Sequence, residues 1–193
     1  MNSKIKKTLI VVGVIFAFCM FVKIVGDIEL SSASSSPGVS ASRSDKAKFT
    51  DFYKAVMGHA QVMEAIYNPF QRAISEGDGL RATQIALNIK DRFNQEWSAM
   101  YNMSAPDFAN AVTAEKTKDA KDTLAAAYFC KTEVLKKFIN AADKPTMKNI
   151  ADMKNSAEQS QAYMLAAMAK FFDAASTVGI TPEEITEMTK KPN

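Results

Sequence analysis

The chain has 193 residues, of which 24 are Lys or Arg and 21 are Asp or Glu, giving a formal net charge of +3. Most of the excess belongs to the first 30 residues, because from Arg43 onward 20 basic residues are balanced by 19 acidic ones. This balance argues against the basic face that a nucleic-acid-binding protein requires, and about 150 residues suffice for one domain with a hydrophobic core.

The first 30 residues combine a lysine-rich start with an apolar run. Residues 9–22 carry no charge, and Lys23 follows them. The run has the length of the apolar core of a signal peptide. Alternatively, residues 8–25 form a short membrane-spanning helix if the Lys23 ammonium reaches the lipid headgroups. We favour an uncleaved signal anchor, because no convincing small-residue cleavage site follows, and a cleaved signal peptide stays open. Both predict export of the remaining chain, since lysines ahead of an apolar segment stay cytoplasmic.

A serine-rich segment comes next. Residues 31–44 contain eight serines together with Pro37 and Gly38. Such a segment has too little apolar surface to offset the entropy lost on ordering, so we expect a flexible tether. The sequence then divides into a signal anchor or signal peptide with its flank (1–30), the tether (31–44) and an exported domain (45–193). We expect this domain in the periplasm or extracellular space, on a single-pass anchor or secreted if the anchor is cleaved.

The exported domain begins with an apolar stripe of helical period. Its spacing alternates between four and three residues, which predicts one long helix packed at a shallow angle against others, as in a coiled coil. Pro69 interrupts the pattern and predicts either a kink or a widened pocket beside it. Residues 76–79, Glu-Gly-Asp-Gly, predict the end of the helix and a turn. The stripe comprises Phe49, Tyr53, Val56, Ala60, Met63, Tyr67, Phe70 and Ile74.

The second predicted helix spans about 25 residues, returns along the first and ends within residues 102–106. Ser104, Pro106 and Asp107 form a capping signature, which predicts that the third helix starts there. That helix has a weak start of polar residues and alanines over 113–122. The two apolar stripes are Ala82, Ala86, Ile89, Phe93, Met100 and Met103 with Trp97 beside them, and Leu124, Ala127, Tyr128, Val134, Leu135 and Phe138.

A fourth stripe follows residues 143–146 and ends at Gly179. Thr181, Pro182 and Glu184 predict a further helix start, because threonine caps, proline suits the first turn and glutamate can reach back. Short connections make consecutive helices antiparallel. We therefore expect an all-α fold, an up-down four-helix bundle with a short C-terminal fifth helix. The fourth stripe is Ile150, Met153, Ala157, Met164, Met168, Phe171, Ala175 and Val178.

His59 is the only histidine in the chain. A nucleophilic site needs a base and an orienting group, and di-iron bundles need inward Glu-x-x-His pairs; neither pattern occurs, so we expect no enzyme. A bundle can bind haem through one His and one Met, and Met63 lies one turn from His59. Haem binding and copper binding stay open as alternatives, but methionines at helical spacing are usually core residues, so we expect no cofactor and no metal. The copper candidates are Met57, Met63, Met164 and Met168.

Lys131 lies near the centre of the third apolar face. A buried lysine without a partner would lose its charge or destabilise the fold, so it needs either a partner or a route to solvent. In an up-down bundle it lies at the level of Tyr67. Two interpretations remain open: an ammonium that extends outward between helices, and a buried polar layer that sets the helix register.

Six apolar residues project away from the predicted core faces. Scattered singly, such residues are ordinary on a soluble protein, but together they can form a second surface. Either the short fifth helix covers some of them, or they contact a partner protein or a second copy of the chain. They are Val62, Leu87, Phe129, Tyr163, Leu165 and Phe172.

The sequence favours a non-enzymatic, membrane-tethered helical module that binds another envelope or extracellular protein. The anchor, the tether, the mixed charge and the off-stripe apolar residues support this interpretation. We expect contact with a membrane through residues 8–25 and with a protein partner, with a homo-oligomer left open and no nucleic acid. The alternative is a small-ligand- or haem-binding bundle in the periplasm or extracellular space, supported by His59, the methionines and the break at Pro69.

Overall fold

The computed structural model describes residues 43–144 and 146–189. Within these ranges every regular element is a helix and no strand occurs, so the all-helical prediction is confirmed. The apolar run 8–25 and most of the serine-rich segment lie outside the described residues, and what was expected of them stays a prediction. None of the described helices is both long enough and apolar enough to cross a membrane. The helices are α2 (Arg43–Ser75), α3 (Gly79–Tyr101), α4 (Ala111–Asp143), α5 (Met147–Ser176) and α6 (Pro182–Thr189).

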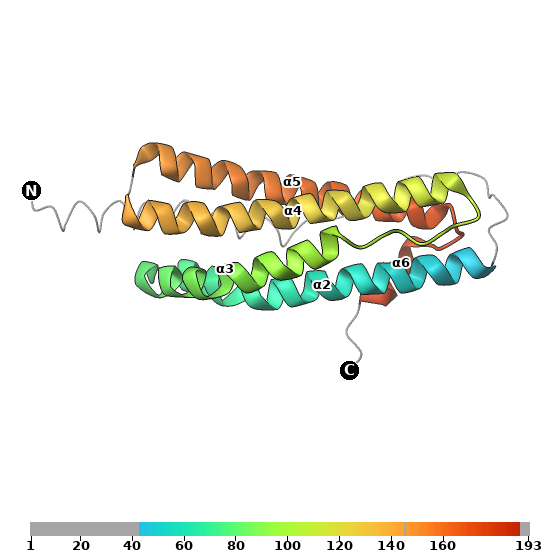
Figure 1. Ribbon diagram of the computed structural model, residues 1–193, viewed down its shortest axis with the longest axis horizontal. Helices are drawn as coiled ribbons and strands as arrows, with labels where there is room; N and C mark the ends of the chain where they lie inside the picture. The colour runs from blue at the N-terminus through green and yellow to red at the C-terminus, as the bar shows by residue number, and fades with distance from the viewer. Residues whose placement is uncertain (1–42, 145, 190–193) are drawn as a thin grey trace, which may run out of the picture.

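The four long helices form two layers, with α2 beside α3 and α4 beside α5, and consecutive helices run in opposite directions (Figure 1). Helix α4 packs along both α3 and α5, and α2 packs along α3. Helix α3 is shorter than its neighbours, and the chain continues from it as an extended segment, residues 102–110, toward the start of α4. Helix α6 lies across the bundle and contacts α2 and α5.

The core is built mainly from the stripes that the sequence predicts. Ile89, Ile150 and Met164 of those stripes are only half-buried, and Phe52 and Phe108, which lie outside them, are buried. All eight residues of the first stripe are buried. Aromatic rings join the layers: Phe70 of α2 meets Phe138 of α4 edge-on at 5.0 Å between centroids, and Phe93 of α3 lies 6.2 Å from Tyr128. Each large aromatic side chain buries about 150–250 Å², so these rings dominate the burial energy of a bundle this size.

Helices α4 and α5 make the most extensive contact of any pair of described helices. Small buried residues line their contact, and the Ser160 hydroxyl donates a hydrogen bond to the Ala127 carbonyl of α4 at 2.9 Å. The distance between packed helices depends on the side chains at the contact, and alanine and serine permit a short one.

The predicted start of the third helix at Ser104 to Asp107 is wrong. Helix α4 begins at Ala111, and the Asn110 side chain caps it by accepting a hydrogen bond from the Val112 N–H at 2.9 Å. Tertiary contacts explain the difference, because the preceding segment rests on the start of α2. There the Lys48 ammonium donates to the Asp107 carbonyl, and the Ala109 N–H donates to Asp45 Oδ1 at 3.3 Å.

The sequence also predicted a capping box at the start of α6 and a kink or pocket at Pro69. At α6 the capping box forms: Thr181 N–H donates to Glu184 Oε2 at 2.9 Å, and Glu184 N–H donates to Thr181 Oγ1 at 3.3 Å. Pro69 lies inside helix α2, which continues past it to Ser75. The neighbouring Tyr67 and Phe70 are buried and pack on each other, with ring centroids 5.3 Å apart.

Candidate functional site

Three aromatic side chains gather on the surface where α3 ends beside α4. The Trp97 ring stacks on Tyr101 with centroids 5.5 Å apart and an interplanar angle of 25°, and it lies 5.3 Å from the Phe129 ring. Tyr101 is 52% exposed and Phe129 is 42% exposed. We call Trp97, Tyr101 and Phe129 the aromatic cluster.

Hydrogen bonds hold the aromatic cluster in place. The Trp97 indole N–H donates to the Ala125 carbonyl at 2.9 Å, which ties the last turns of α3 to α4. The buried Lys121 ammonium donates to the Tyr101 carbonyl at 2.6 Å and lies 5.4 Å from the Tyr101 ring centroid. A cation suits the negative end of a helix dipole and the face of an aromatic ring. The rings are thus presented to solvent on a rigid support.

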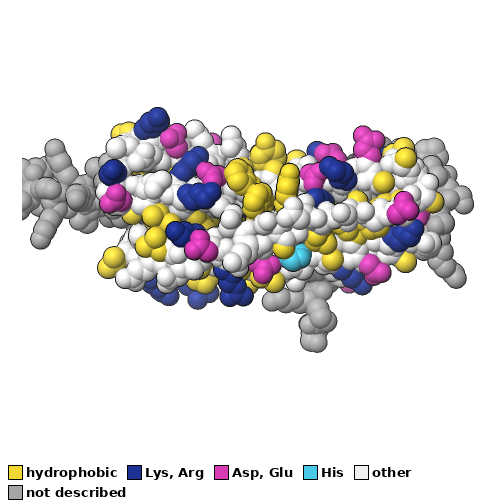
Figure 2. Space-filling model, viewed as in Figure 1, with side chains coloured by type: hydrophobic (Ala, Val, Ile, Leu, Met, Phe, Trp, Pro, Cys, Tyr) yellow, Lys and Arg dark blue, Asp and Glu magenta, His cyan; other side chains and the backbone are white. Residues whose placement is uncertain are grey.

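The aromatic cluster belongs to a longer uncharged band. Residues 97–101 of α3, 123–130 of α4 and 159–169 of α5 contain no Asp, Glu, Lys or Arg. The Trp97–Ala125 and Ser160–Ala127 hydrogen bonds put these three stretches at one level of the bundle. Figure 2 shows hydrophobic side chains midway along the upper layer, with acidic and basic side chains gathered toward each end.

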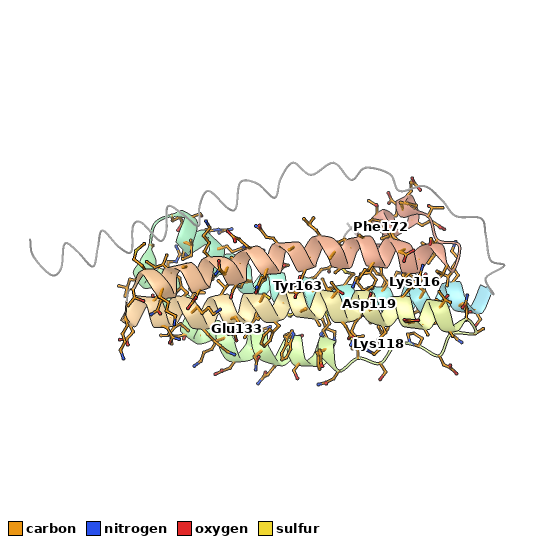
Figure 3. All side chains as sticks on the ribbon, turned by 90° about the horizontal axis from the view of Figure 1, so that it is seen from above. Lys116, Lys118, Asp119, Glu133, Tyr163 and Phe172 are labelled. Carbon is orange, nitrogen blue, oxygen red and sulfur yellow. The ribbon has the colours of Figure 1, made fainter. Side chains whose placement is uncertain are left out.

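Charges at both ends of the uncharged band are paired within the chain. At one end, Lys118 contacts Asp122 at 2.6 Å and Lys170 contacts Asp119 at 2.9 Å. At the other end, Lys136 contacts Glu133 at 2.8 Å. Figure 3 shows Lys118 and Asp119 on α4 well separated from Glu133 along the same helix. The two ends therefore carry charge but little local excess of either sign.

Asp122 has two cationic partners, because Lys121 also contacts it at 2.6 Å. Burial alone would raise the pKa of the Asp122 carboxyl. Hydrogen bonds from Lys118 and Lys121 outweigh burial and hold this pKa below its ordinary value. Asp122 is thus an ionised carboxylate that pairs with two lysines next to the aromatic cluster.

The structure distributes the six off-stripe apolar residues over four helices. Val62, Leu87 and Leu165 are exposed on α2, α3 and α5. Phe172 is half-buried against the core and lies on the side of α5 toward α6, whereas Tyr163 lies on the side toward α4 (Figure 3). Of the six, Phe129 alone belongs to the aromatic cluster.

Sequence reasoning did not identify Tyr101, and it placed Trp97 only at the edge of a core stripe. Two signals in the sequence could have found them. The pair is spaced by four residues near the predicted end of a helix, which puts both rings on one face. The absence of charge over residues 123–130 and 159–169 also marks the faces that become neighbours in the bundle.

His59 joins α2 to α3 rather than to Met63. Its Nδ1 lies 3.0 Å from Glu96 Oε2, with both side chains partly exposed, and the single cyan side chain in Figure 2 marks its position. Met63 is buried in the core, Met57 and Met164 are half-buried against the core, and Met168 is half-buried. Among the described residues, no group of three His, Cys, Asp or Glu side chains is arranged to hold a metal ion.

Lys131 lies in a polar layer between α2 and α4. Its ammonium pairs with Glu64 and lies 5.1 Å from the ring centroids of both Tyr67 and Tyr128. The Tyr128 hydroxyl donates to the same Glu64 oxygen at 2.9 Å. Burial, followed by the negative charge of Glu64, raises the pKa of both tyrosines, so their hydroxyls stay protonated.

Comparison of the chain with protein-family models, with curated proteins and with solved structures gave no match in any of the three.

Proposed function

We propose that this chain is a non-enzymatic, membrane-tethered helical module that binds another envelope or extracellular protein molecule. In this proposal the N-terminal apolar run is the anchor, residues 31–44 are the tether, and the remainder is an up-down four-helix bundle with a short fifth helix. The exposed and rigidly held aromatic cluster is the single observation that carries the proposal. The surrounding uncharged band supplies the area for contact.

The composition of this surface matches that of a protein interface. The centres of interfaces are enriched in Tyr, Trp and Phe and depleted of charge, while their rims are polar. Aromatic residues fixed before binding lose little conformational entropy when a partner covers them, so they are frequent hot spots. The aromatic cluster has this character, and the ion pairs at the ends of the uncharged band have the character of a rim.

The polar groups give less support to catalysis. The side chain that bonds the His59 imidazole is Glu96, a carboxylate and not a hydroxyl or thiol nucleophile. Burial raises the pKa of the Cys130 thiol, which works against the thiolate that a cysteine nucleophile needs. The Glu64–Lys131 pair is a second polar group of interest, but two tyrosine rings cover its ammonium.

The test is site-specific photo-crosslinking of the full-length chain in its native membrane. A photoreactive phenylalanine analogue replaces Tyr101, and a matched variant carries it at Ala142, which is exposed on α4 far from the aromatic cluster. We expect a protein adduct at position 101 and none at position 142, with mass spectrometry identifying the partner. Equal adducts at both positions, or none at position 101, would contradict the proposal.

A further inference from the structure

We propose that the protein molecule bound at the uncharged band is a second copy of this chain, paired through antiparallel α4 helices about a two-fold axis at Phe129. The inference rests on the proposed function, because it names the partner of that same surface. Its basis is the placement of opposite charges at equal distances on either side of Phe129.

Asp122, Phe129 and Lys136 are spaced by seven residues each along α4. Seven residues make nearly two full turns, so the three side chains share one face of the helix. Each lies about 10 Å along the helix axis from the next. Phe129 and Lys136 are exposed on this face and Asp122 is half-buried. The three side chains are thus acidic, aromatic and basic in order along the helix, while Lys118 and Lys121 pair with Asp122 and Glu133 pairs with Lys136 within the molecule.

A two-fold axis at Phe129 reverses this order in the second molecule. Asp122 of one copy then lies opposite the partner's Lys136, and the converse pair forms on the other side of the axis. A two-fold interface requires such self-complementarity, because every contact between two different positions occurs twice. The two Phe129 rings meet at the axis, with Trp97 next to each.

Neither charged group is left unpaired in the single molecule, since Asp122 contacts Lys118 and Lys136 contacts Glu133. A carboxylate offers about four acceptor positions and an ammonium three donors, so both groups can take a further partner. The Asp122 carboxylate and the Lys136 ammonium can therefore each make one further contact across the proposed two-fold axis.

Zero-length crosslinking of the full-length chain in its native membrane tests the inference. A carbodiimide joins a carboxylate directly to an amine that contacts it. Within one helix Asp122 and Lys136 are about 21 Å apart, so an amide link between them forms only between two molecules. We expect an Asp122–Lys136 linked peptide in a dimer band, whereas Lys118–Asp122 and Glu133–Lys136 links appear in monomer and dimer alike.

Substitution supplies the control. Phe129→Lys places a charge at the axis and should reduce the dimer yield about tenfold or more, as loss of an interface hot spot does. Met147→Lys changes a side chain that is 82% exposed at the far end of α5 and should leave the yield unchanged. Circular dichroism of both variants confirms that each remains helical.

The outcomes separate this inference from the proposed function. A dimer containing the Asp122–Lys136 link supports both. A crosslink from position 101 to a different protein, without the Asp122–Lys136 link, overturns the second copy as partner and leaves the proposed function standing. Absence of any protein adduct at the uncharged band overturns both.

Discussion

The carboxylate of Glu64 and the ammonium of Lys131 form an ion pair that ties α2 directly to α4, two helices separated in sequence by all of α3. The Glu64 side chain is 36% exposed and the Lys131 side chain 14% exposed, so the pair lies at the edge of the core. Tyr128 completes the layer through its hydrogen bond to Glu64. A polar layer of this kind favours one axial register of the two helices over neighbouring ones, since a shift by one turn would separate the pair.

Replacement of Lys131 by methionine should lower the free energy of unfolding by about 1–2 kcal/mol. The substitution removes a charged hydrogen bond, while Glu64 keeps the Tyr128 hydroxyl and partial access to water, which limits the loss. Urea unfolding followed by circular dichroism measures it. In a double-mutant cycle with Glu64→Gln we expect a coupling energy of about 1 kcal/mol. If Lys131→Met proved neutral or stabilising, the ammonium would be merely solvated and would not stabilise the fold.

Asp122 should make stability depend on acid pH. Its pKa in the folded state lies below the ordinary value of about 3.9, because hydrogen bonds from Lys118 and Lys121 outweigh burial. A group with a lowered folded pKa contributes stability that is present above the unfolded pKa and is lost as pH falls through the folded pKa.

The comparison that isolates this contribution is wild type against Asp122→Asn. At pH 6 the variant should be less stable by at most about 1 kcal/mol, since the carboxylate is partly exposed. The difference should shrink as pH falls from about 4 through the folded-state pKa of Asp122, because the wild-type carboxyl then becomes protonated too. A difference that stays constant over this range would show that the ionised carboxylate contributes nothing, and the measurement is a set of urea titrations at stepped pH.

Two glycines should respond in opposite directions to substitution by alanine. Gly77 follows the end of α2 with a φ of 77°, in the left-handed region, and Asp78 N–H donates back to the Ala73 carbonyl at 3.0 Å. Gly77→Ala should cost about 1 kcal/mol through backbone strain. Gly58 lies inside α2, so Gly58→Ala should stabilise by about 0.5–1 kcal/mol.

Steric clashes contribute to neither stability change, because a Cβ added at either glycine meets no atom within 4 Å. The difference between the variants thus reports backbone conformation alone. Thermal unfolding of both proteins in one buffer is sufficient. A stabilising Gly77→Ala would be incompatible with the described end of α2.

Asp45→Ala should loosen the segment 102–110 without unfolding the bundle. Asp45 Oδ1 accepts the Ala109 N–H, and this buried carboxylate also lies 3.8 Å from the Lys48 ammonium. Loss of one such hydrogen bond costs about 1–2 kcal/mol. Hydrogen exchange at the Ala109 amide should accelerate by about tenfold or more, while amides in the middle of α4 keep their protection. Unchanged exchange at Ala109 would mean that the contact does not hold the segment.

The helices and their buried faces were predictable because they depend on local periodicity. Phe49 to Ile74 recur every three to four residues, and any helix with that stripe must bury it. The start of α4 was not predictable in this way. Ser104 and Asp107 carry a good local capping signal, but the contacts of Asp45 and Lys48 keep the segment extended until Asn110 supplies the cap.

At the aromatic cluster, too, some features were predictable from the sequence and others depend on tertiary contacts. Phe129 was recognisable as an apolar residue off the core stripe, whereas its contact with Trp97 depends on how α3 and α4 are aligned. Spacing within one helix could not reveal that alignment. The charge-free stretches of α4 and α5 were visible in the sequence, and their common level in the bundle was not.

The sequence by itself determined that the described part of this protein is helical and which side of each helix faces inward, because both follow from interactions between residues at most a few positions apart. Only the tertiary structure decided that Lys131 meets Glu64, that His59 meets Glu96 and that Trp97, Tyr101 and Phe129 share one surface. Such pairs depend on the axial register and rotation of whole helices, which the packing of all the side chains sets together.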